Sequence, residues 1–269
     1  MRRPELLVLG HVTRDEGAGE PRLGGAASYA AAVAARLGIS TALVTVAPPE
    51  DPLLEQLRGI SGLAVHCVPD QRITTFALAY EGERRRLTLR RRARALRPDD
   101  VPLAWRDVSV AYVGPVAGEC DRELVQSLGA AFTGAGLQGW LRRTAPDGTV
   151  EPDMRPEALV PPVLGAAILS EEDHPESEAI AARFVAAGAV VAVTRGAKGA
   201  TLRTAGGPPV VVPAAPAREV DPTGAGDTFG VVLTLRLAAG ASLEEAGAAA
   251  ARAAARVVEG PGLGSLAAF

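Results

Sequence analysis

The stretch DPTGAGDTFG, residues 221–230, decides how this sequence is interpreted. Pro222 ends any preceding strand, and Gly224, Ala225 and Gly226 leave their backbone N–H groups open to close approach by another molecule. The apolar sequence that follows predicts a helix, whose N-terminal end carries a partial positive charge. Small residues, open N–H groups and a helix N-terminus together predict an anion-binding site.

Asp227 lies in the first turn of that predicted helix, where its negative charge does not help to bind an anion. The carboxylate is suited to accept a proton from a hydroxyl group to which a phosphoryl group is being transferred. The alternative is structural: Asp227 complements the helix dipole, and the glycines serve a tight turn.

Further glycine-containing stretches occur along the chain. RLGGAASYAAAVAARLG (22–38) places Gly24 and Gly25 before a predicted helix, and three shorter stretches are GHVTRDE (10–16), TRGAKG (194–199) and VEGPGLGS (258–265). With DPTGAGDTF, they resemble in the same order the signatures of the ribokinase-like carbohydrate kinases, the phosphofructokinase B (pfkB) family. The resemblance covers nearly the whole chain.

The resemblance implies a three-layer α/β/α ribokinase-like fold with a mainly parallel central sheet and a small β-lid. It implies ATP-dependent transfer of the γ-phosphoryl group to a hydroxyl of a small sugar, polyol or nucleoside, with Mg²⁺ bridging the phosphates. Asp227 would be the general base, and the backbone of Gly224, Ala225 and Gly226 the anion hole. The other implied residues are Asp15, Gly24, Gly25 and Tyr29 for the acceptor; Thr194, Gly196, Gly199 and Gly260 for the nucleotide; Asp173 for the metal; and Asp221 and Thr223 for a monovalent cation.

Two positions depart from the family pattern. Tyr29 stands where many members carry an asparagine that binds the sugar, and Ser170 with Asp173 replaces an Asn-x-x-Glu motif. The sequence contains no asparagine, and Lys198 is its only lysine, so both changes are interpreted against a compositional bias. They leave the acceptor and the metal geometry open. The alternative function is a catalytically weak kinase-fold protein that binds nucleotide or sugar as a regulator.

GLQGWLRR (136–143) is not general to the family. With the GGAAS stretch it resembles the small members that include myo-inositol kinases. We assign Gln138 and Trp140 to local packing; the alternative is that Gln138 faces the acceptor pocket.

The hydrophobic pattern alternates short β-branched runs with longer Ala/Leu stretches, which predicts a parallel sheet covered on both faces. The expected strands are 5–9, 41–46, 63–68, 108–113, 165–169 and 190–194. The expected helices are 26–37, 51–58, 121–128, 176–187, about 224–239 and 243–258, the last with a Ser242–Glu245 capping box.

We interpret residues 1–269 as a single domain, with a β-lid inserted at about 12–22 and 71–93. The stretch 72–93 predicts two strands joined by a turn at 81–83. The resemblance implies that this lid covers the sugar and could mediate a homodimer. Eight arginines lie between Arg84 and Arg97, which indicates a solvated strand face or, alternatively, a surface for an anion or a partner.

Composition excludes several functional classes. The net charge of −3 gives no reason to expect a nucleic-acid or membrane partner, and no run of 18 apolar residues is present. The sequence spacing predicts neither a metal site nor a catalytic triad among Cys67, Cys120 and the three histidines. The N-terminal apolar run is too short for a signal peptide. We therefore expect a cytoplasmic protein with free thiols. The absence of G-x-G-x-x-G after the first strand excludes a Rossmann dehydrogenase.

Overall fold

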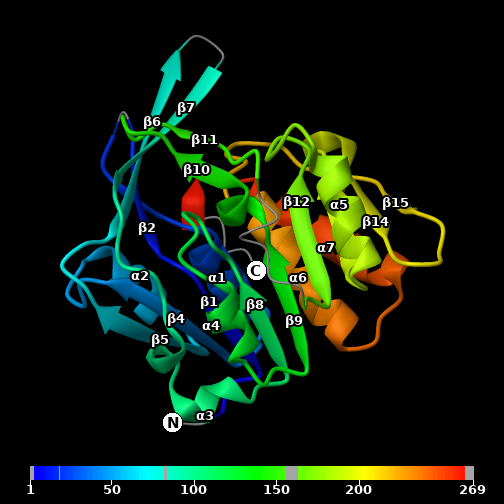
Figure 1. The fold of residues 1–269 in the computed structure, drawn as a ribbon, viewed down its shortest axis with the longest axis horizontal. Coiled ribbons are helices and arrows are strands. Elements are labelled where there is room, and N and C mark those ends of the chain that lie inside the picture. The colour runs from blue at the N-terminus through cyan, green and yellow to red at the C-terminus, as the bar shows by residue number, and fades with distance from the viewer. Residues whose placement is uncertain (1–2, 18, 82–83, 156–162, 264–269) are drawn as a thin grey trace.

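The computed structural model describes residues 3–17, 19–81, 84–155 and 163–263. Its centre is a nine-stranded sheet in the order β15-β14-β13-β12-β9-β8-β1-β4-β5 (Figure 1). The strands from β13 to β5 in this order run parallel, and β14 and β15 are antiparallel at one edge. Their bounds are β1 Leu6–Leu9, β4 Thr41–Ala47, β5 Leu63–Pro69, β8 Val110–Val113, β9 Phe132–Gly136, β12 Ala166–Ser170, β13 Val190–Thr194, β14 Ala200–Arg203 and β15 Val210–Val212.

Successive side chains of the central strands enter two separate cores. Leu6 and Val8 of β1 belong to one apolar cluster, and Leu7 and Leu9 belong to the other, all of them fully buried. A strand buried on both faces is expected to be continuously apolar, as Leu6–Leu9 is. The short apolar runs in the sequence therefore predicted correctly where these strands lie.

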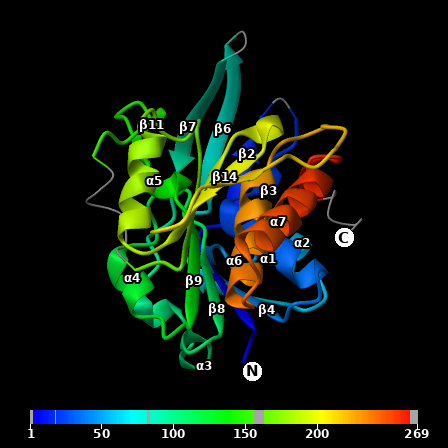
Figure 2. The same ribbon diagram turned by 90° about the vertical axis from the view of Figure 1, so that its right-hand side faces the viewer.

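Helices cover both faces of the sheet, as Figure 2 shows. On one side α1, α2, α6 and α7 contribute to the first cluster, and on the other side α3, α4 and α5 contribute to the second. This arrangement confirms the predicted three-layer α/β/α fold. The bounds are α1 Ala26–Arg36, α2 Leu53–Arg58, α3 Leu103–Arg106, α4 Arg122–Gln126, α5 Ser177–Ala186, α6 Ala225–Ala238 and α7 Leu243–Val257. None of the described helices is both long and apolar enough to cross a bilayer.

The predicted start of α7 is confirmed in detail. The Ser242 Oγ accepts a hydrogen bond from the Glu245 N–H at 3.2 Å, and the Glu245 carboxylate accepts one from the Ser242 N–H at 3.1 Å. Two orphan donors of the helix N-terminus are thereby satisfied.

A second sheet of four strands, in the order β3-β2-β6-β7, stands beside the main one; we name it the lid sheet. Its strands are β2 Thr13–Glu16, β3 Arg22–Gly24, β6 Thr74–Glu81 and β7 Arg84–Arg91. The two strands expected in 72–93 are present, and residues 82–83 of the expected turn lie outside the described residues.

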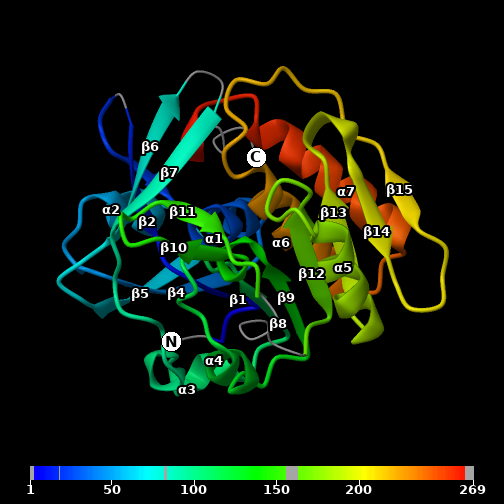
Figure 3. The same ribbon diagram turned by 45° about the horizontal axis from the view of Figure 1, so that its top comes forward.

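A third, two-stranded sheet was not predicted. It pairs β10 (Arg142–Thr144) with β11 (Val150–Pro152) and lies along the lid sheet, as Figure 3 shows. The turn between these strands meets β7, where Thr88 and Thr149 form an isolated β-bridge.

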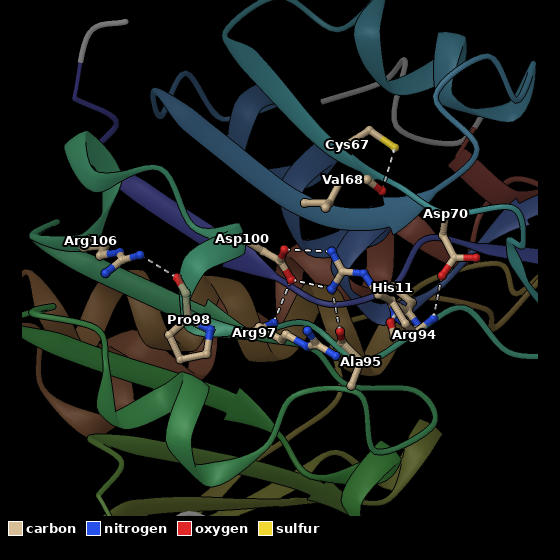
Figure 4. A network of polar contacts seen from close by, with 10 residues as sticks. All are labelled: His11, Cys67, Val68, Asp70, Arg94, Ala95, Arg97, Pro98, Asp100 and Arg106. Atoms are coloured by element: carbon tan, nitrogen blue, oxygen red, sulfur yellow. Dashed lines mark hydrogen bonds and ion pairs between the residues drawn. The ribbon is translucent and has the colours of Figure 1, made fainter.

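A buried polar network holds the base of the lid sheet, part of which is drawn in Figure 4. The His11 Nε2 lies 2.9 Å from the Arg94 carbonyl, and its Nδ1 lies 2.8 Å from the Thr74 hydroxyl. Because the Arg94 carbonyl can only accept, the neutral imidazole carries its proton on Nε2, and its Nδ1 accepts from the Thr74 hydroxyl, whose oxygen accepts from the Ala93 N–H. Burial lowers the pKa of His11, which keeps the ring neutral. His11 is therefore structural.

Arg94 also belongs to this network. Its guanidinium donates to both Asp100 carboxylate oxygens at 2.7 Å, and its N–H donates to Asp70 at 3.0 Å. At least one arginine of the predicted basic cluster thus forms a partly buried ion pair instead of standing on a solvated strand face. Both cysteine thiols are free, with Cys120 buried and Cys67 half-buried.

Candidate active site

The N-terminus of α6 is built around a glycine that no other residue could replace without strain. Gly224 is the N-cap, with φ 82° and ψ −1°, a left-handed conformation. A Cβ at this position would lie 2.1 Å from a ring carbon of Tyr29. Tyr29, which is 2% exposed, therefore packs directly on the turn that begins the helix.

The first turn of α6 presents open N–H groups. The Ala225 N–H reaches the Pro222 carbonyl at 3.2 Å, and the Thr228 N–H reaches the Gly224 carbonyl at 2.9 Å. Within the described part of the chain, the N–H groups of Gly226 and Asp227 have no acceptor. A Cβ at Gly226 would meet no protein atom within 4 Å, so the space before these groups is open to a ligand.

Two cavities meet at this turn. The first, of about 520 Å³, lies between the lid sheet, the ends of β8 and β12, and α6. The second, of about 420 Å³, lies between α6, α7 and the loops at 194–200 and 214–222. Six residues line both cavities: Thr194, Gly196, Glu219, Pro222, Ala225 and Gly226.

The two cavities differ in character. Five carboxylates line the first: Asp15, Glu172, Asp173, Glu219 and Asp227. The second is lined mostly by small apolar side chains from α7 and the 214–217 loop, closed by Phe229. A polar cavity suits a hydroxylated molecule and phosphates, and the apolar one suits a flat organic group.

The carboxylate of Asp227 faces the first cavity and has an unusual environment. Burial, and next the negative charge of Asp173, raise the pKa of Asp227 from 3.8 to about 7, and the positive charge of Arg142 partly opposes this. A carboxyl group with a pKa near the working pH can both accept and release a proton. The purely structural alternative for Asp227, a complement to the helix dipole, does not require such a pKa.

Asp173 is held in place by two donors. The Gln138 side-chain amide donates to its Oδ1 at 2.8 Å, and the Ser170 N–H donates to its Oδ2 at 2.8 Å. Gln138 belongs to a short 3₁₀ turn, η2 (Gln138–Trp140), and lines the first cavity. The interpretation of Gln138 as local packing is wrong. Trp140 does serve packing, since it is buried and donates to the Cys120 carbonyl at 2.6 Å.

Asp15 lies on β2 at the lid side of the first cavity. Its Oδ1 accepts from the Thr13 hydroxyl at 2.8 Å. A Cβ at Gly24 would lie 2.1 Å from the Asp15 Oδ2, so the first glycine of the pair makes room for this carboxylate. Gly25 has φ 98° and begins α1, and it lines the cavity together with Tyr29. The structure thus brings Asp15, Gly25 and Tyr29 together with Asp227.

Tyr112, at the end of β8, is a cavity residue that the sequence analysis missed. It is fully buried, and its hydroxyl has no hydrogen-bond partner among the described residues. A Cβ at Gly230 would lie 2.4 Å from that hydroxyl, so a second glycine of the 221–230 stretch makes room for a side chain. A buried donor without a partner at a cavity wall points to a ligand.

The residues expected at the nucleotide are placed unequally. Thr194 and Gly196 lie at the junction of the two cavities, and Gly199 lines the second. Gly260 lies in the described loop after α7 but lines neither cavity. Its assignment stays a prediction.

Asp221 links two loops beside the site. Its Oδ1 accepts from the Thr223 N–H at 3.0 Å, its Oδ2 accepts from the Gly262 N–H at 3.3 Å, and the Arg22 guanidinium lies 3.9 Å from Oδ2. Thr223 lines the first cavity. Among the described residues, no group of three or more His, Cys, Asp or Glu side chains is placed to hold a metal ion.

Comparison with known proteins gives the class. The model of the pfkB family of carbohydrate kinases matches residues 7–268, so the chain belongs to this family. It is therefore a carbohydrate kinase by family, with the ribokinase-like fold that the sequence predicted. No functionally curated protein matches the sequence significantly.

Solved structures of the same fold include kinases with different donors and acceptors. A pyrophosphate-dependent kinase of the ribokinase family, complexed with a pyrophosphate analog and myo-inositol, is similar with a TM-score of 0.82 at 21% identity, covering 98% of this chain and 100% of that one. Arabidopsis thaliana ribokinase with ribose and ATP has a TM-score of 0.75 at 20% identity, covering 98% and 95%. Fructokinase from Vibrio cholerae O395 has a TM-score of 0.73 at 19% identity, covering 100% and 99%. At such identities the likeness establishes the fold and not the substrate.

Proposed function

We propose that this protein transfers the γ-phosphoryl group of ATP to a hydroxyl of a small sugar or polyol, with Asp227 as the general base. The observation that carries the proposal is the placement of Asp227, whose pKa is raised to about 7, beside open N–H groups where a polar and an apolar cavity meet. A base and an anion site in one helical turn are what phosphoryl transfer to an alcohol requires.

The proposed step is an in-line displacement. The acceptor hydroxyl oxygen forms a bond to the γ-phosphorus, the bond from phosphorus to the bridging oxygen of ADP breaks, and the hydroxyl proton passes to the Asp227 carboxylate. The N–H groups of Gly226 and Asp227, in the turn that Gly224 and Ala225 form, receive the charge of the transferred group. The electron pair of the broken bond leaves with ADP.

The second cavity favours a nucleotide over inorganic pyrophosphate, the donor named for three of the similar solved structures. Pyrophosphate has no apolar part, so it has no use for a cavity of about 420 Å³ lined by alanines and Phe229. An adenine ring fills such a space and buries apolar surface there. We therefore assign this cavity to the base of the donor.

The site also suits Mg²⁺. Mg²⁺ prefers oxygen ligands and is commonly held by one or two carboxylates together with substrate phosphates. The Asp173 carboxylate, fixed by Gln138 and the Ser170 N–H, faces the first cavity, and no larger protein cage exists among the described residues. When bound, Mg²⁺ would neutralise phosphate charge. The monovalent cation expected at Asp221 and Thr223 stays a prediction. The Arg22 guanidinium, 3.9 Å from the Asp221 Oδ2, already supplies a positive charge there and reduces the need for a cation.

The acceptor side suits a small polyhydroxylated molecule. Asp15 can accept hydrogen bonds from paired hydroxyls, and the unpartnered Tyr112 hydroxyl can donate one. Phe76, Leu78 and Leu87 of the lid sheet form the apolar part of the wall. Closure of this sheet over the acceptor would exclude water, which competes as phosphoryl acceptor.

The experiment measures the transfer directly with a matrix of donors and acceptors. Mg-ATP and Mg-pyrophosphate are each offered with myo-inositol, ribose, fructose and a nucleoside, and the phosphorylated product is quantified. We expect product with ATP and one member of the sugar or polyol set. Product with pyrophosphate alone would contradict the assignment of the second cavity.

The same matrix tests the regulatory alternative. A protein that binds ATP in calorimetry but forms no product with any acceptor, and whose ATP turnover does not exceed that of a variant with Asp227 replaced by asparagine, would support a catalytically weak regulator. Tyr29 and Ser170, which depart from the family pattern, are the residues that motivate this alternative. We do not favour it, because the open first turn of α6 and the perturbed Asp227 are both intact.

A further inference from the structure

The first cavity contains few positive charges for the ligand proposed to enter it. Arg142 is the only basic side chain among the described residues that line either cavity, whereas five carboxylates line the first. The single lysine, Lys198, is absent from both linings and is 79% exposed. A phosphate chain in this place would meet mainly negative side chains, with one exception.

Arg142 begins β10, and the backbone on which it stands is held firmly. Leu141 is fully buried, and its carbonyl accepts from the Asp153 N–H at 2.8 Å. Next to it, the Trp140 side chain is anchored on the Cys120 carbonyl. The neighbouring Arg143 does not line the cavity; it is 59% exposed and pairs with Glu151 at 2.7 Å. Two consecutive arginines are thus directed to different surroundings.

Arg142 also acts on the candidate base. Its positive charge opposes the effect of burial and of Asp173 on the pKa of Asp227. Both side chains line the first cavity, so the guanidinium borders the same space as the Asp227 carboxylate at the first turn of α6, where the N–H groups are open. Four groups act on Asp227 or are acted on by it in this way: Asp173 after β12, Arg142 on β10, Tyr112 on β8 and Tyr29 on α1.

The β10–β11 hairpin that carries Arg142 is attached to the lid sheet. The Leu89 N–H of β7 donates to the Gly148 carbonyl at 2.8 Å, and Arg86 donates to the Thr149 hydroxyl at 3.1 Å. Val150 of β11 packs in an apolar cluster with Phe76 and Leu89 of the lid sheet. Phe76 itself lines the first cavity.

We propose that Arg142 contacts the transferred phosphoryl group and compensates its charge, and that the β10–β11 hairpin, docked on β7, fixes it there once the lid sheet has received the acceptor. This inference rests on the proposed phosphoryl transfer and adds a catalytic residue to it. The planar guanidinium offers two parallel donors to phosphate oxygens, and a charge at the equatorial oxygens stabilises the transition state more than the ground state.

The test compares Arg142→Gln and Arg142→Lys with Arg143→Gln, a matched control on the next residue of the same strand. We expect Arg142→Gln to lower kcat about 100- to 1000-fold, the scale of losing one charge-stabilising donor, with the acceptor KM changed less than about 3-fold. Arg142→Lys should recover part of the loss, because it keeps the charge but not the paired donors. Arg143→Gln should match the wild type.

A binding measurement keeps the inference separate from the proposed function. Inorganic tripolyphosphate, which carries phosphate charge and no base, is titrated into each variant by calorimetry, after thermal unfolding has shown that the variants fold equally well. We expect about 10-fold weaker binding for Arg142→Gln and no change for Arg143→Gln, whether or not an acceptor has been found. Equal binding and equal kcat in Arg142→Gln and Arg143→Gln would overturn the role of Arg142. If the wild type transfers no phosphoryl group but Arg142→Gln still binds tripolyphosphate more weakly than Arg143→Gln, the result would count against the proposed reaction and not against the role of Arg142 in binding phosphate.

Discussion

The proposed donor half of the site and the proposed acceptor half are assembled in different ways. The proposed phosphate site consists of backbone groups and small residues within 221–230, and the apolar cavity assigned to the base is completed by small side chains of α7 and the 214–217 loop. Around the acceptor, side chains come from β2, α1, β6, β7 and β8, which are far apart in the sequence. A local stretch can therefore carry the reaction class, whereas the acceptor depends on how distant elements meet.

The largest effect on turnover is expected from replacing Asp227, which lies where the two halves of the site meet. Asp227→Asn should keep the fold and lower kcat about 10²- to 10⁴-fold, because the amide cannot take the hydroxyl proton. Both donor and acceptor should still bind, which calorimetry with ATP and with the acceptor would check. Turnover close to the wild type would refute the role of Asp227.

The donor half can be broken next at its open glycine. Gly226→Val should lower kcat about 10- to 10³-fold, because the new side chain fills space that no protein atom occupies and that the phosphates need. The kcat of Gly226→Ala should lie between those of Gly226→Val and the wild type. Since the position has room, both should unfold at nearly the wild-type temperature. Full activity of the valine variant would place the phosphates elsewhere.

The assignment of the second cavity is sharpened by filling it. Ala254→Leu, on α7, should raise the KM for ATP about 10-fold, because the leucine occupies the space assigned to the base, while the acceptor KM stays unchanged. Ala248→Leu, on the same helix but lining neither cavity, serves as the control. A change in the acceptor KM, with that for ATP unaffected, would reverse the assignment of the two cavities.

The smallest expected effect concerns the acceptor half. Tyr112→Phe should raise the acceptor KM about 3- to 10-fold and leave the KM for ATP unchanged, because it deletes a buried hydroxyl that lacks a protein partner. For the same reason it should not lower the unfolding temperature. A loss of stability without any change in the acceptor KM would show that the hydroxyl serves the fold instead.

Prediction from the sequence succeeded where structure is local. Six parallel strands were placed from their apolar runs, and the start of α7 was placed from Ser242 and Glu245. It failed at β9, because FTGAG lacks the β-branched pattern of a strand. The reason lies in tertiary packing: a Cβ at Gly134 would lie 2.1 Å from the Thr234 hydroxyl of α6. No rule of strand propensity contains that contact.

The same limit explains why Arg142 and Gln138 were not assigned to the first cavity. Arg142 is one of 27 arginines and stands on a three-residue strand, so nothing in its neighbourhood distinguishes it from the exposed Arg143. Gln138 was read as packing because its partner, Asp173, is 35 residues away. Asp227 was found because its signal, a carboxylate between glycines and a helix, is contained in ten residues. Residues whose role depends on contacts with segments distant in the sequence had no comparable local signal.

The most direct test of the account is the pH dependence of kcat/KM for phosphoryl transfer, measured from about pH 5.5 to 8.5 in the wild type and in Asp227→Asn. Because the pKa of Asp227 is raised to about 7 and only the ionised carboxylate accepts a proton, the wild-type rate should rise with pH and level off above about pH 7. Asp227→Asn should show a low rate without this rise. A wild-type profile that is flat across the range, or one that the variant shares, would contradict the assignment of Asp227 as the base.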